Sequence, residues 1–64
     1  MQPIYRVAPT MLCCAPAKTF PTAVEALRYG REAADAYRVG YVVYRVLAGR
    51  LLRLAAYEPQ PVRA

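Results

Sequence analysis

The sequence predicts a single small α+β domain in which one amphipathic helix covers one face of an antiparallel sheet. A capped helical stretch spans 22–39, an alternating run interrupted by a glycine spans 41–57, and short proline-punctuated segments precede both over 1–20. Residues 58–64 contain two prolines, and we expect them to form a flexible tail. With 64 residues, the domain 1–64 can bury only about 60% of its unfolded surface, so a partner would add stability.

The helix has recognisable ends. Thr22 followed by Glu25 forms a capping box, and Gly40 is expected to end the helix as its left-handed residue. At helical spacing the inward stripe consists of Ala23, Ala26, Leu27, Gly30, Ala33, Ala34 and Tyr37, and the opposite side carries Glu25, Arg28, Glu32, Asp35 and Arg38. Because the stripe is made of small side chains that allow a close approach, we expect Gly30 to be a contact point between helix and sheet.

The N-terminal segment offers two candidate strands, at 4–8 and 11–15. Prolines at positions 3, 9, 16 and 21 each remove a backbone donor, so the strands should be short and near a sheet edge. Either segment could pair with the hairpin as a third strand.

The run 41–57 predicts a β-hairpin. A two-residue turn at Ala48 and Gly49 would place Ala48 at positive φ, so we expect a three-residue loop in which Gly49 alone is left-handed, as a G1 bulge. Alternation then sorts the side chains onto two faces. The apolar set expected against the helix, with Leu54 buried, is Val42, Tyr44, Val46, Leu52, Leu54 and Ala56; the outward set is Tyr41, Val43, Arg45, Leu51, Arg53, Ala55 and Tyr57.

The outward set contains the candidate partner-binding residues. We expect Tyr41, Arg45, Arg53 and Tyr57 to lie close together, with Arg50 and Arg6 at the margin. Arginine and tyrosine are enriched among interface hot spots, and the same pair suits base stacking combined with phosphate contact. The alternative is that arginine stems and tyrosines only cover their own sheet and bind nothing.

Catalysis is not expected. The chain has no histidine and no serine, so the usual general base and the serine nucleophile are both missing. Cys13 and Cys14 cannot complete a zinc site without two further ligands, and we expect neither a metal nor a cofactor. We interpret the two cysteines as small buried residues in a reducing compartment; a redox-sensitive or intermolecular thiol is the alternative.

The charge predicts an acidic partner. Nine basic residues against four acidic ones give +5, with a pI near 9.7. We expect a non-enzymatic binding protein that occupies an acidic protein surface, and as the alternative a nucleic-acid binder. The apolar fraction of 58% also predicts self-association, as a dimer. No stretch approaches the roughly 20 apolar residues of a membrane span, and the N-terminus lacks a secretory signal, so a cytoplasmic location is expected.

In size, arginine content and strand-helix-hairpin layout, the chain resembles the small accessory proteins of phages and mobile elements. These include anti-CRISPR and other host-takeover inhibitors, which act by blocking surfaces. The resemblance lies in the general arrangement and in no residue string, so no functional residues follow from it. It implies an inhibitor of a host defence or nucleic-acid-handling complex.

Overall fold

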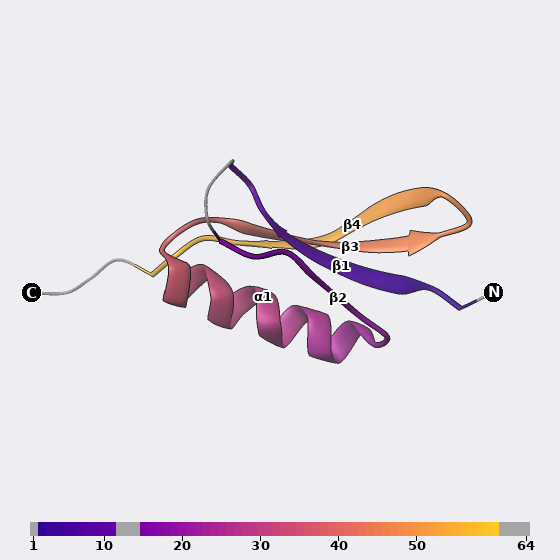
Figure 1. Cartoon of the computed structure of the whole chain (residues 1–64), viewed down its shortest axis with the longest axis horizontal. Helices are drawn as coiled ribbons and strands as arrows, with labels where there is room; N and C mark the ends of the chain where they lie inside the picture. Colours follow the sequence, from indigo (N-terminus) through magenta and orange to yellow (C-terminus); the bar gives the residue numbers. More distant parts are fainter. Residues whose placement is uncertain (1, 12–14, 61–64) are drawn as a thin grey trace, which may run out of the picture.

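The computed structural model describes residues 2–11 and 15–60, which form an α+β domain, as the sequence predicts (Figure 1). The elements are, in chain order, β1 (Ile4–Pro9), β2 (Lys18–Phe20), α1 (Ala23–Tyr37), β3 (Tyr41–Leu47) and β4 (Arg50–Tyr57). The strands form one antiparallel sheet in the order β2-β1-β3-β4, and α1 lies across one of its faces.

The predicted N-terminus of the helix is confirmed, whereas its C-terminus lies earlier than predicted. The Thr22 hydroxyl accepts from the Glu25 N–H at 3.4 Å, and the left-handed residue at the other end is Arg38, with φ 59°. Gly40 instead allows Thr10 to approach the backbone closely. A methyl group there would lie 2.9 Å from Thr10 Oγ1, and the Gly40 carbonyl accepts from the Thr10 N–H at 2.9 Å.

One of the two candidate N-terminal strands is confirmed. The segment 4–8 lies within β1, which pairs with β3. The strand that pairs with the other edge of β1 is β2, and not the predicted segment 11–15, of which residues 12–14 lie outside the described residues. The prediction for Cys13 and Cys14 therefore falls outside the described part of the chain.

The predicted three-residue loop is wrong. Leu47 pairs with Arg50, which leaves a two-residue turn in which Ala48 has φ 52° and Gly49 has φ 78°. Two successive positive φ angles define a type I′ turn, whose twist matches that of the flanking strands. The match with strand twist therefore outweighs the steric preference of Ala48.

A β-bulge lies further along the hairpin. Val43 pairs with Ala55, whereas the next residue, Tyr44, pairs with Arg53, so Leu54 is an extra residue in β4. Because cross-strand partners share a face, the bulge changes which residues of β4 lie on each side. This shift is absent from the sequence prediction.

The helix covers the face that was predicted to be outward. Val43 and Tyr41 are completely buried, and Tyr57 is half-buried. The core consists of Val7, Ala26, Ala33, Ala34, Tyr41 and Val43. The reason is steric: the alanines and Gly30 of α1 leave room that large tyrosine and valine side chains fill. Leu54, predicted to be buried, is 39% exposed.

Gly30→Ala should lower the free energy of unfolding by about 1 kcal/mol, although alanine is the better helix former. A methyl group at Gly30 would lie 3.0 Å from Val43 Cγ2 and 3.3 Å from Tyr57 Cδ2. Overpacking costs about 1–3 kcal/mol and exceeds the helix-propensity gain of about 1 kcal/mol. Urea denaturation measures the change. Ala36→Gly, at an exposed position of the same helix, calibrates the propensity term, and a stabilised Gly30→Ala would contradict the close approach.

Ala48→Asn should raise the free energy of unfolding by roughly 0.5–1 kcal/mol, because asparagine tolerates the positive φ of Ala48 better than alanine does. Thermal or urea denaturation can measure the gain. The same change at Ala36 should instead destabilise the helix, and an equal response at both positions would contradict a type I′ turn.

Candidate binding surfaces on the sheet

No other described helix or strand covers the sheet face opposite α1 (Figure 1), although Val42 on this face is only 8% exposed. Side chains alternate across strands, and Val43 faces Gly30 of α1, so the neighbours of Val43 in β3 point the other way. Cross-strand register extends this assignment to the other strands. We call this surface the open face; it consists of Ile4, Arg6, Ala8, Thr19, Val42, Tyr44, Val46, Leu51, Arg53 and Ala56.

A row of arginine and tyrosine crosses the middle of the open face. Tyr44 lies directly opposite Arg6 on one side and Arg53 on the other. Directly paired residues have Cβ atoms about 4.5–5.5 Å apart, so the three side chains lie side by side. We call these three residues the arginine-tyrosine row.

Apolar rows flank the arginine-tyrosine row. Ile4, Val46 and Leu51 form the row nearer the hairpin turn, and Ala8, Val42 and Ala56 form the row on the other side. Ile4 is 51% exposed and Leu51 is 65% exposed, so large aliphatic side chains meet solvent beside the arginines. None of the residues in the three rows is acidic, so the open face combines positive charge with unburied apolar area.

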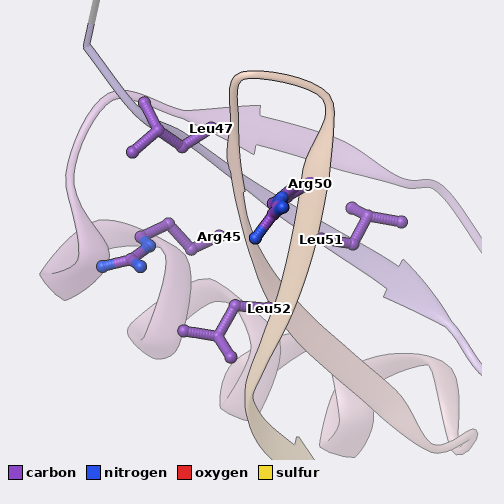
Figure 2. A pocket seen from close by; sticks show the side chains of 5 residues that line it. All are labelled: Arg45, Leu47, Arg50, Leu51 and Leu52. Carbon is purple, nitrogen blue, oxygen red and sulfur yellow. The ribbon is translucent and has the colours of Figure 1, made fainter.

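A second surface lies on the helix side of the hairpin, close to its turn. The turn extends beyond the first residues of α1, so the helix leaves this end of the hairpin uncovered (Figure 1). A hollow of about 320 Å³ is lined there by Arg45, Leu47, Arg50, Leu51 and Leu52. Figure 2 shows Arg45 and Leu52 on one side of the ribbon and Leu51 pointing to the other. We call this site the tip hollow.

The structure therefore divides the residues predicted to form one surface. Arg45 lies on the helix side and Arg53 on the open face, because the two-residue turn pairs Arg45 with Leu52 and Tyr44 with Arg53, whereas the predicted three-residue loop would have placed both arginines on one face. Arg50 accompanies Arg45 in the tip hollow, and Arg6 accompanies Arg53 in the arginine-tyrosine row.

The two predicted tyrosines do not contribute an exposed surface. Tyr41 is completely buried, and its hydroxyl donates to the Pro16 carbonyl at 2.9 Å. Tyr57 is half-buried against Gly30. Sequence reasoning missed Tyr44, which was assigned to the helix side. The alternation of Ile4, Arg6 and Ala8 carried a signal, since it marks one apolar and basic strand face.

The described residues hold no cluster of three metal-ligating side chains.

One buried hydroxyl stands out: Tyr29 Oη has no hydrogen-bond partner among the described residues. Its ring packs 5.3 Å from Phe20 and 6.3 Å from Tyr41, between centroids, and the Lys18 ammonium lies 5.2 Å from its centroid. Burial, together with the nearby Tyr37, raises the pKa of the Tyr29 hydroxyl. A raised pKa makes this hydroxyl a poorer nucleophile near neutral pH, so we interpret Tyr29 as a packing residue.

Comparison of the chain with protein-family models, with curated proteins and with solved structures found no match. Within residues 2–11 and 15–60, no helix combines the length and apolar character that crossing a membrane requires.

Tyr29→Phe should leave the free energy of unfolding at neutral pH unchanged or raise it by about 1 kcal/mol, because it removes a buried hydroxyl without a partner. Tyr41→Phe is the matched control: it removes the donor to the Pro16 carbonyl and should cost about 1–2 kcal/mol. Equal losses in both variants would contradict the packing role of Tyr29.

Tyr29→Phe should also change how stability depends on pH. The folded chain holds the Tyr29 proton more tightly than the unfolded chain does, because its folded pKa is raised. This contribution is fully present below about pH 10, the ordinary tyrosine value, and is lost as the pH rises through the folded pKa. Tyr29→Phe should therefore lose less stability than the parent chain above about pH 10, as urea denaturation at a series of pH values can measure.

Proposed function

We propose that this chain is a non-enzymatic binding protein whose open face docks onto an acidic and partly apolar surface of another protein. The arginine-tyrosine row carries the proposal. It places two exposed guanidiniums beside one ring, and no carboxylate stands in the same rows to neutralise them.

The flanking rows support a protein partner. The exposed apolar area of Ile4 and Leu51 is removed from solvent only when another apolar surface covers it. Each Å² buried in this way contributes about 25 cal/mol. Arginine adds paired hydrogen bonds to carboxylates, which favours acidic side chains at the centre of the contact. A surface with carboxylates flanked by apolar side chains therefore matches the open face in both respects.

Nucleic acid remains the alternative ligand, because Tyr44 between two arginines suits one stacked base. The arrangement of the aromatic residues makes this alternative weaker. Of the six tyrosines, only Tyr44 lies on the open face, since the others belong to α1 or to the helix side of the sheet. Platforms for single strands stack successive bases on several rings, and here one half-buried ring is present.

Self-association through the open face is less favourable than binding an acidic partner. Two copies placed face to face would bring Arg6 and Arg53 of both together, without an acidic residue from the three rows between them. Desolvating unpaired like charges is costly. Pairing through the free edge of β4 is also hindered, because the bulge at Leu54 and the charges of Arg50 and Arg53 interrupt that edge.

The nature of the partner is a further part of the proposal. Small accessory proteins of phages and mobile elements, which this chain resembles in layout, block surfaces of host complexes. An acidic surface on a host defence or nucleic-acid-handling complex is therefore the target class that we propose. A carboxylate-rich surface presents the same sign of charge as nucleic acid, and an arginine-rich face is attracted to either.

Arg6→Gln combined with Arg53→Gln should abolish capture of the partner from nuclease-treated lysate by the immobilised chain. The variant removes both guanidiniums of the arginine-tyrosine row and lowers the net charge by two. Loss of two central charged contacts typically costs about 2–5 kcal/mol, or roughly thirtyfold or more in affinity. Quantitative mass spectrometry of the captured proteins, with circular dichroism of each variant, measures the effect.

Arg28→Gln combined with Arg31→Gln provides the matched control, because it removes the same charge from the exposed side of α1. It should retain capture. Equal loss in both variants would show that only net charge matters. Loss of capture after nuclease treatment would favour the nucleic-acid alternative. So would an affinity whose logarithm falls steeply with the logarithm of the salt concentration.

A further inference from the structure

The register of the hairpin builds the tip hollow. Leu47 pairs with Arg50, and Arg45 pairs with Leu52, so these four residues share the helix side of the hairpin next to its turn. Arg45 and Arg50 are therefore diagonal neighbours, and the two leucines occupy the other diagonal. Leu52 is 49% exposed, because α1 does not reach this part of the hairpin.

The charges of the tip hollow are not balanced within the described residues. Neither Arg45 nor Arg50 forms an ion pair there, and every other residue lining the hollow is a leucine. Two guanidiniums held on one diagonal repel each other, and an anion between them would remove this repulsion. A carboxylate can accept from both guanidiniums at once, since each of its oxygens accepts separately.

The size and lining of the tip hollow favour a peptide. Its volume of about 320 Å³ lies at the lower end of ligand pockets, enough for one or two side chains. The leucines offer an aliphatic contact, and the lining contains no aromatic ring on which a base could stack. The hollow of about 290 Å³ lined by Arg6, Ala17, Lys18 and Thr19 lacks a large apolar side chain, so it would hold an aliphatic group less well.

We propose that the tip hollow is a second binding site, separate from the open face, that takes an acidic peptide segment. A glutamate or aspartate of the segment bridges Arg45 and Arg50, and a neighbouring aliphatic side chain covers Leu47 and Leu52. The site does not require the open face to be occupied, because its two arginines and the leucines Leu47 and Leu52 lie on the helix side of the hairpin, and only Leu51 borders both surfaces.

Titration of the full chain with a short peptide of alternating glutamate and leucine tests the site. With methyl-labelled leucine and ¹⁵N-labelled arginine, NMR should show shift changes centred on the Leu47 and Leu52 methyls and on the Nε–H groups of Arg45 and Arg50. A peptide with glutamine in place of glutamate should bind at least about tenfold more weakly, since it cannot make the charged hydrogen bonds.

Arg45→Gln combined with Arg50→Gln should weaken glutamate-peptide binding by about tenfold or more. Arg6→Gln combined with Arg53→Gln removes the same charge from the open face and should change it less than about threefold. Equal weakening by the two variants, or shift changes spread over the open face, would overturn the site. So would tighter binding at the tip by a single-stranded oligonucleotide of equal charge. Because capture through the open face is measured separately, either surface can fail without the other.

Discussion

The close approach of α1 to the sheet at Gly30 determines how the rest of the chain is used. The side chains of Gly30 and the neighbouring alanines are small, so they fill little of the space between helix and sheet. Large side chains of the covered sheet face, those of Tyr41, Val43 and Tyr57, fill it instead. Once those residues are placed inward, alternation sends Val42, Tyr44 and Val46 to the opposite side. The composition of the open face is thus a consequence of the helix contact.

The same constraint separates the roles of the aromatic residues. The rings of Tyr29 and Tyr37 pack against Tyr41 of the covered face, and Phe20 packs against Tyr29. Tyr44 alone is left beside arginines on the open face. Folding therefore buries most of the aromatic surface, and the surface that is left to contact a partner is mainly aliphatic and basic. This composition suits a protein surface better than a run of bases.

Charge is distributed unevenly over the fold. Three of the four acidic residues belong to α1 and the fourth follows β4, whereas β1 and the hairpin carry Arg6, Arg45, Arg50 and Arg53 without an acidic residue among them. The net charge of +5 is thus concentrated on the sheet and its turn. An acidic surface would be attracted to this end of the molecule during encounter, and the side chains on each face would then decide which contact forms.

The sequence by itself determined the elements whose signals are local. Thr22 and Glu25 define the start of α1, and alternation with a central glycine defines a hairpin from Tyr41 to Tyr57. Only the tertiary structure decided which hairpin face is covered, that a two-residue turn places Arg45 and Arg53 on opposite faces, and that Leu54 interrupts the register. Alternation yields two sets of side chains but does not say which set meets the helix. That choice depends on the volume the helix leaves, and a bulge depends on pairing across strands that local sequence does not encode.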